Sequence, residues 1–200
     1  MTLREYVDSI RNKLVAVIGI GVSNTPLLKL LAAEGLRVAA CDKRTREQMG
    51  QQAEDLERLG CELHLGPDYL KDLEADVIFR TPGLRPDVPE ISACVQKGAV
   101  LTSEMEVFFQ ICPCPIIAVT GSDGKTTTTT IISKLLAAEG KIVHVGGNIG
   151  HPLLCDTPEI APEDMAVLEL SSFQLMTMQQ SPHIAVVTNP LPNTGISLPF

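Results

Sequence analysis

Short apolar runs alternate with helix-like segments along most of this chain. Residues 14–20 form an apolar run that contains one glycine near its end, and residues 24–35 place leucines at helical spacing before a glycine stop. The same order repeats downstream, with strands expected at residues 37–41, 61–65 and 76–79 and a polar helix at residues 47–59. Strands that alternate with helices favour a parallel sheet covered by helices, which is the α/β class.

A proline-rich break interrupts this pattern near residue 112. Before it, we expect a helix at residues 89–97, a strand at 99–102 and a helix at 104–110. Residues 112–115 then read Cys-Pro-Cys-Pro, and two prolines in four residues suit neither a helix interior nor a central strand. We therefore predict a Rossmann-like, parallel-sheet domain over residues 1–111 and a second domain over residues 112–200.

The second domain restarts the alternation and begins with the most informative segment of the chain. Strands are expected at residues 116–120, 141–145, 165–170 and 184–188, and a helix at residues 126–139. The first strand leads directly into Thr-Gly-Ser-Asp-Gly-Lys-Thr-Thr, residues 120–127. A glycine-rich turn between a strand and a helix is typical of proteins that hold a nucleotide triphosphate. Plain capping of a threonine-rich helix is the alternative, which the Gly-Lys-Thr cluster at this junction disfavours.

Each residue type in this loop has a physical role in phosphate binding. Gly121 and Gly124 allow a tight turn in which successive backbone amides point at phosphate oxygens. Lys125 supplies a positive charge for the β- and γ-phosphates, and Thr126 offers a hydroxyl to Mg²⁺. The loop is a variant, because Val119 stands where the first glycine of the common G-x-x-x-x-G-K-[ST] motif belongs. The predicted ATP-binding residues are Gly121, Ser122, Asp123, Gly124, Lys125, Thr126 and Thr127.

Composition sets broad limits on partners and location. The 200 residues are 44% hydrophobic, and 16 basic against 24 acidic residues give a net charge of −8. This charge argues against a general affinity for nucleic acid or for an anionic membrane, so any phosphate site must be local. The first apolar run is interrupted by glycines and follows early acidic residues, so it is neither a signal peptide nor a membrane span. We expect a cytoplasmic monomer.

The six cysteines are scattered, mostly within apolar runs. No C-x-x-C pair is present in the sequence, and the C-x-C spacing of residues 112–114 lacks a second cluster or a histidine pair. A linker is therefore favoured over a metal site at these residues. We interpret the cysteines as reduced thiols of the core.

A second candidate site follows the first strand. Gly19 and Gly21 open the turn before a helix, and Asp42 ends the next strand about where a ribose-binding acid belongs in a dinucleotide fold. Asn24 replaces the third glycine of that fingerprint, so a nucleotide-like ligand is predicted and NAD is disfavoured. Residues 81–83, Thr-Pro-Gly, follow another strand at the same carboxyl edge, where open α/β sheets bind ligands. A simple proline turn is the alternative for these three residues.

Glu169 lies within an apolar run of the second domain. A carboxylate in a hydrophobic strand costs several kcal/mol if it is unpaired, so we expect a cation beside it. Mg²⁺ next to Thr126 is the candidate, and a structural ion pair is the alternative.

These motifs give the chain a resemblance to the Mur ligase family. The residues that carry it are 120–127, Gly-Gly-Asn-Ile-Gly at 146–150, Leu-Glu-Leu-Ser-Ser-Phe-Gln-Leu at 168–175 and Ser-Glu-Met-Glu-Val-Phe-Phe at 103–109. The resemblance covers residues 1 to about 189. It implies a uridine-nucleotide-binding domain followed by the first part of a P-loop ATPase domain, with ATP and Mg²⁺ as cofactors.

The reaction implied by the resemblance is an ATP-dependent ligation in peptidoglycan precursor synthesis. In this family the γ-phosphate of ATP passes to the carboxylate of a UDP-linked substrate, and an amino-acid amine then attacks the acyl phosphate. The Glu-Leu-Ser-Ser-Phe-Gln string is most similar to the member that adds D-glutamate to UDP-N-acetylmuramoyl-L-alanine. Positioning and electrostatics carry such chemistry.

By matching position, the resemblance also implies roles for individual residues. Lys125 and Glu169 are the implied catalytic residues, with Thr126 and Glu169 as ligands of Mg²⁺. The implied contacts to the UDP-linked substrate are Val22, Ser23, Asp42, Lys43, Thr81, Gly83, Asn148 and Ser171.

The match ends after residue 193. Thr194 stands where the family has a histidine, and we expect neither the rest of the ATPase domain nor the C-terminal, amino-acid-binding domain of the family in this chain. We therefore expect an incomplete ATPase domain, and a chain without D-glutamate ligase activity of its own. Three alternatives stay open: another ligase of the family, such as the L-alanine-adding one, a non-catalytic nucleotide-binding module, and a Rossmann oxidoreductase.

Overall fold

Two parallel sheets organise the structure, a computed structural model that describes residues 1–189. The first sheet contains, in spatial order, β3 (Glu62–Leu65), β2 (Arg37–Asp42), β1 (Leu14–Ile18), β4 (Val77–Arg80) and β5 (Val100–Thr102). The second contains β7 (Val143–Gly147), β8 (Met165–Glu169), β6 (Ile116–Thr120) and β9 (Ile184–Val187). All neighbouring strands are parallel, which confirms the predicted α/β class.

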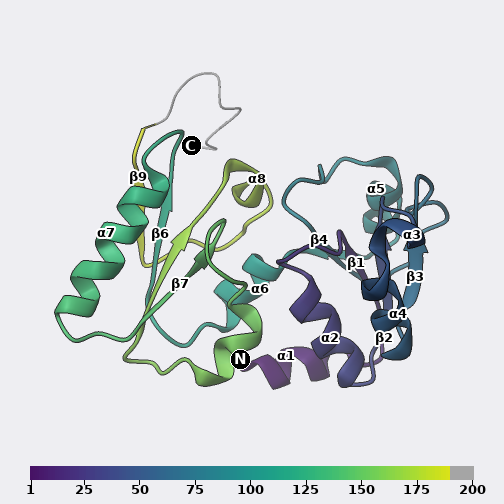
Figure 1. Ribbon diagram of the computed structural model, residues 1–200, viewed down its shortest axis with the longest axis horizontal. Coiled ribbons are helices and arrows are strands. Elements are labelled where there is room, and N and C mark those ends of the chain that lie inside the picture. Colours follow the sequence, from purple (N-terminus) through teal and green to yellow (C-terminus); the bar gives the residue numbers. More distant parts are fainter. Residues whose placement is uncertain (190–200) are drawn as a thin grey trace.

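Helices connect the strands and cover the sheets (Figure 1). Those of the first unit are α1 (Leu3–Ser9), α2 (Thr25–Ala33), α3 (Arg46–Met49), α4 (Gln51–Arg58), α5 (Pro89–Gln96) and α6 (Glu104–Ile111). The second unit contains α7 (Lys125–Ala138), the 3₁₀ helix η1 (Leu154–Glu159) and α8 (Ser172–Leu175). Figure 1 shows α6 between the two sheets, and α7 against the second sheet.

The central strands are buried on both faces, which explains their continuous apolar sequences. Residues 15–18 of β1 are at most 1% exposed. Because β1 lies between β2 and β4, the strand order reverses direction at β1. Open sheets of this kind bind ligands at such a reversal, outside the carboxyl ends of the strands.

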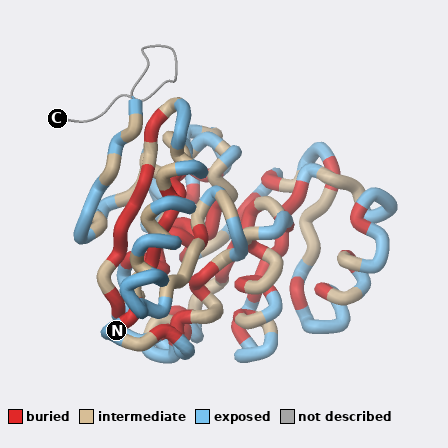
Figure 2. The backbone as a smooth tube through the Cα atoms, turned by 60° about the vertical axis from the view of Figure 1, so that its left-hand side comes forward, coloured by how far each residue is buried: buried red, intermediate tan, exposed pale blue. Residues whose placement is uncertain are grey.

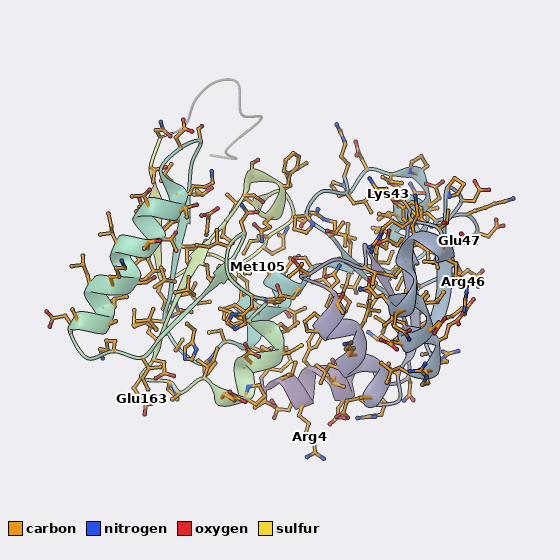
Figure 3. All side chains as sticks on the ribbon, in the orientation of Figure 1. Arg4, Lys43, Arg46, Glu47, Met105 and Glu163 are labelled. Carbon is orange, nitrogen blue, oxygen red and sulfur yellow. The ribbon has the colours of Figure 1, made fainter. Side chains whose placement is uncertain are left out.

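The two units share one hydrophobic core. Phe108 of α6 packs in the same cluster as Phe79 of β4 and Leu168 of β8. Figure 3 labels Met105, also on α6, in the middle of the molecule between the sheets. Figure 2 shows buried segments running through both sheets and exposed stretches on the outer helices. The units are therefore packed together by their apolar side chains.

Several elements differ from the sequence expectations. The single helix expected at residues 47–59 is wrong, because the chain turns at Gly50 with a φ of 52° and divides it into α3 and α4. The pattern also missed α1, η1 and α8, which are short. The predicted domain boundary between residues 111 and 112 stays a prediction; α6 ends at Ile111, and β6 begins at Ile116.

All six cysteines are free thiols. Cys112 and Cys155 are only half-buried, so the expectation of core thiols holds for the other four. The Sγ atoms of Cys112 and Cys114 lie 3.6 Å apart. Within residues 1–189, no group of three or more His, Cys, Asp or Glu residues could hold a metal ion. The same residues contain no helix with the length and apolar character needed to cross a membrane.

Candidate active site

The predicted phosphate loop connects β6 to the first turn of α7. Gly121 has a φ of 137°, and a Cβ atom there would clash with the hydroxyl of Thr188. Only glycine fits both this backbone conformation and this close approach. Helix α7 has 14 residues, and the amides of its first turn have no acceptor within the helix. The loop therefore leads into first-turn amides that lack an acceptor within the helix, at the positive end of a helix dipole.

Lys125 lies at the start of α7 and folds back over the loop. Its Nζ donates to the carbonyl oxygens of Gly121, at 2.8 Å, and Ser122, at 2.9 Å. These bonds hold the ammonium against the turn that precedes α7. The arrangement can present a positive charge to an anion bound at the loop.

Glu169, Thr126 and Asn148 meet where β8 ends. The Glu169 side chain is 2% exposed, and its Oε2 accepts a hydrogen bond of 2.6 Å from the Thr126 hydroxyl. Its Oε1 accepts from Asn148 Nδ2 at 3.0 Å, and the Asn148 amide donates to the Glu169 carbonyl oxygen at 2.7 Å. A buried carboxylate beside a hydroxyl is the oxygen donor set that Mg²⁺ prefers, so these residues fit the ion. Asn148 is thus connected to Thr126, the residue after Lys125, through the carboxylate of Glu169.

The segment after β9 supports the phosphate loop, and this support was not predicted from the sequence. The Asn189 carbonyl oxygen accepts from the Ser122 amide at 2.8 Å, and Asn189 Oδ1 accepts from the Asp123 amide at 2.9 Å. The Thr188 hydroxyl donates to the Asp123 carbonyl oxygen at 2.6 Å. These contacts fix the loop on the side of β9. Thr194, where the family has a histidine, lies outside the described residues.

The second candidate site is a pocket of about 250 Å³ at the carboxyl edge of the first sheet. Four of its lining residues were predicted to contact the UDP-linked substrate, namely Asp42, Lys43, Thr81 and Gly83. The others are Ile18, Gly19, Tyr69 and Leu84. Figure 3 labels Lys43 at the rim of this unit. Tyr69, whose phenol has a pKa raised by burial, gave no signal in the sequence.

Asp42 is held by neighbours that sequence reasoning missed. Its Oδ2 accepts from the Ile20 amide at 2.7 Å, and both of its oxygens accept from the Arg44 guanidinium at 3.0 Å. Burial alone would raise the pKa of Asp42, but the hydrogen bonds from Arg44 and Ile20 lower it below its ordinary value. The carboxylate is ionised at neutral pH and fixes the turn after β1.

Val22 and Ser23 lie outside this pocket. Val22 is 79% exposed, and Ser23 lines a separate cavity of about 20 Å³ between the units. Asn24 is 2% exposed and donates through Nδ2 to the carbonyl oxygens of Ile18 and Gly19. The residue that replaces the third glycine therefore fastens the turn to the strand.

Ser171 caps the short helix α8. Its hydroxyl accepts from the Gln174 amide at 3.3 Å, and Gln174 Oε1 accepts from the Ser171 amide at 2.9 Å. Only Leu170 separates Ser171 from Glu169 in the chain. The cap thus fixes the segment that leaves the Glu169 cluster toward the first unit.

Two family profiles match the chain at these sites. The profile of the Mur ligase MurD-like, N-terminal domain matches residues 13–103, and that of the Mur ligase middle domain matches residues 119–191. The chain belongs to the Mur ligase family. It carries the N-terminal domain of a Mur ligase, with the first pocket, and the phosphate-loop part of the middle domain.

Curated relatives support this membership. A protein of Ruminiclostridium cellulolyticum named UDP-N-acetylmuramoylalanine–D-glutamate ligase is 53% identical over 192 residues, 96% of this chain and 41% of that protein. A protein of Clostridium novyi with the same name is 50% identical over 193 residues, 96% of this chain and 42% of that protein. The chain thus spans about two fifths of the length of these relatives.

A solved structure supports the fold. The chain is similar to UDP-N-acetylmuramate:L-alanyl-gamma-D-glutamyl-meso-diaminopimelate ligase from Neisseria meningitides, with a TM-score of 0.51 and 22% identity. The match covers 90% of this chain and 61% of that chain. At this identity, the similarity describes the arrangement of sheets and helices only.

Proposed function

We propose that this chain forms the UDP-substrate and ATP sites of a ligase that adds D-glutamate to UDP-N-acetylmuramoyl-L-alanine. The observation that carries the proposal is the cluster of Thr126, Glu169 and Asn148 next to Lys125, where the phosphate loop enters α7. The identity of 50–53% to relatives with that name supports the choice of substrate. The proposed location is cytoplasmic, where ATP is available.

The chain's own residues position and stabilise charge in this proposal. The first-turn amides of α7 and the Lys125 ammonium bind the phosphates of ATP and offset charge on the group that is transferred. Glu169 and Thr126 hold Mg²⁺, which when bound neutralises phosphate charge. The γ-phosphate moves to the substrate carboxylate to give an acyl phosphate and ADP. Amide formation by an amine then releases phosphate.

The UDP part of the substrate is assigned to the pocket of the first sheet. Lys43 supplies a cation for the diphosphate. Thr81 and Gly83 belong to a loop that forms one wall of the pocket. Asp42 is engaged by Arg44 and Ile20, so its proposed role is to shape the turn around the ligand. We assign none of the described residues to D-glutamate.

Ligand selection at the first pocket tests the proposal against the oxidoreductase alternative. Purified protein is titrated calorimetrically with UDP-N-acetylmuramoyl-L-alanine and, separately, with NAD. We expect the UDP-linked ligand to bind more tightly than NAD. Excess ATP should not compete with the UDP-linked ligand. Tighter binding of NAD, or competition between ATP and the UDP-linked ligand for one site, would contradict the assignment.

A further inference from the structure

Arg80 is the largest fully buried side chain of the described residues, and its side chain spans the two units. It is the last residue of β4 and is 1% exposed. On its own side, Nη1 donates to the carbonyl oxygens of Leu84, at 2.9 Å, and Pro82, at 3.3 Å. Both acceptors belong to the loop that forms one wall of the pocket in the first sheet. Arg80 therefore fixes the path of that loop.

The other end of the guanidinium contacts the second unit. Nη2 donates to the Phe173 carbonyl oxygen and to the Thr177 hydroxyl, each at 2.9 Å. Phe173 lies in α8, four residues after Glu169. The Arg80 guanidinium thus joins the loop at the pocket of the first sheet to the segment that follows Glu169 in the second unit. Figure 1 shows α8 on the side of its unit that faces the first sheet.

Burial of this cation has an energetic cost that its partners offset only in part, because its Nε is buried without a hydrogen-bond partner among the described residues. Burial lowers the pKa of Arg80, and the nearby carboxylate of Glu106 on α6 raises it in part. An arginine stays charged in proteins, so the side chain needs hydrogen-bond acceptors to remain buried. Its planar fork reaches acceptors in two directions at once, which a lysine ammonium cannot reproduce. Any relative movement of the units would break bonds to one side.

We propose that Arg80 is a positioning residue that couples the two nucleotide sites, so that ligand in the pocket of the first sheet strengthens MgATP binding at the phosphate loop. This role rests on the proposed function of both sites. A ligand that orders the loop of residues 81–84 also orders the acceptors of Nη1. The guanidinium is then held against Phe173 and Thr177, and the segment after Glu169 is fixed in turn.

The test compares the affinity for MgATP with and without saturating UDP-N-acetylmuramoyl-L-alanine. Measured calorimetrically, the unchanged protein should bind MgATP at least about fivefold more tightly when the first ligand is present. In Arg80→Ala this ratio should fall to about one, and in Arg80→Lys it should be intermediate. Arg85→Lys is the matched control, because Arg85 is exposed directly after this loop and pairs with Asp87. It should keep the full ratio.

A second variant addresses the case in which Arg80→Ala does not fold. Thr177→Val removes one bond of Nη2 and keeps the side-chain volume, so the ratio should fall while the melting temperature stays close to that of the unchanged protein. A merely structural role of Arg80 would lower the melting temperature and leave the ratio unchanged. A ratio of one in the unchanged protein, or an undiminished ratio in Arg80→Ala or Thr177→Val, overturns the proposal. The proposed function fails separately, if either ligand does not bind by itself.

Discussion

The Lys125 ammonium donates hydrogen bonds to two carbonyl oxygens of its own loop. In the proposed site, this is also where it would donate to a bound phosphate. The ammonium therefore has little freedom to lose when the anion binds. In the proposed ATP site, its contribution to affinity is that of a charge-assisted hydrogen bond, and such bonds contribute about 1.5–3 kcal/mol. This value corresponds to a change of roughly tenfold to a hundredfold in affinity.

We predict that Lys125→Ala weakens ATP binding by about that factor. The matched control is Lys134→Ala, since Lys134 is exposed on the same helix, away from the loop. The dissociation constants are measured by titration calorimetry after circular dichroism has shown that each variant is folded. Equal affinities in Lys125→Ala and Lys134→Ala would mean that the loop is structural.

A second prediction concerns Glu169. Glu169→Gln keeps the shape and an acceptor for Thr126 but removes the negative charge that would hold Mg²⁺. We expect the affinity for MgATP to fall roughly tenfold, whereas the affinity for ATP measured with a metal chelator should stay unchanged. The comparison of the two affinities is the measurement. A parallel loss with and without Mg²⁺ would show that Glu169 supports the loop and does not hold the ion.

At the scale of elements, Glu104 joins α6 of the first unit to η1 of the second. Its Oε1 accepts from the Leu154 amide at 2.9 Å. Burial raises the pKa of Glu104 to about 7 from an ordinary value of 4.5, although the amides of Leu154 and Leu153 lower it in part. The folded protein therefore holds a proton that the unfolded chain releases. The stability from this proton is full below pH 4.5 and is lost as the pH rises toward 7.

We predict that Glu104→Gln removes this pH dependence, because glutamine stays neutral. The free energy of unfolding of the unchanged protein, relative to the variant, should fall between pH 5 and pH 7 by at most about 1.4 kcal/mol per pH unit. Chemical denaturation across pH 5–8 measures the difference. A difference that stays constant over this range would contradict the assignment of the raised pKa to Glu104.

Most elements of the fold were predictable because each apolar run forms one strand. The run at residues 14–20 contains β1, which ends at Ile18, and the run at residues 116–120 coincides with β6. The pattern missed α1, which has only 7 residues and depends on a capping box between Thr2 and Glu5. It also joined α3 to α4, since a helical pattern does not show where one glycine turns the chain.

The sites were predictable only in part, because sequence motifs describe local geometry. The phosphate loop and the edge residues Asp42 and Thr81 follow directly from strand ends. Other contributions depend on contacts between segments that are distant in sequence, as for Asn189 and Arg80. The role of Arg44 depends on side-chain geometry that spacing does not encode. Their residue types are ordinary surface types, so no pattern distinguishes them before the chain is folded.

At the scale of the whole molecule, two sheets share one core; the first sheet has a pocket at its carboxyl edge, and the second has the phosphate loop at its own carboxyl edge. The strands β1 and β4 carry the turns of the first pocket, and β6 and β8 carry those of the phosphate loop. The shared packing through α6 keeps these edges in a fixed relation. This arrangement suits the proposed reaction, in which a UDP-linked carboxylate must meet the γ-phosphate of ATP.

The most direct test asks whether one chain binds both nucleotides at the same time at separate sites. Calorimetric titration should give one MgATP and one UDP-N-acetylmuramoyl-L-alanine per chain, each measurable in the presence of the other. Lys125→Ala should weaken MgATP binding by about tenfold or more, with UDP-ligand affinity in its absence unchanged. Lys43→Ala should do the reverse. Competition between the ligands, or a joint loss of both affinities in either folded variant, would contradict the two-site interpretation.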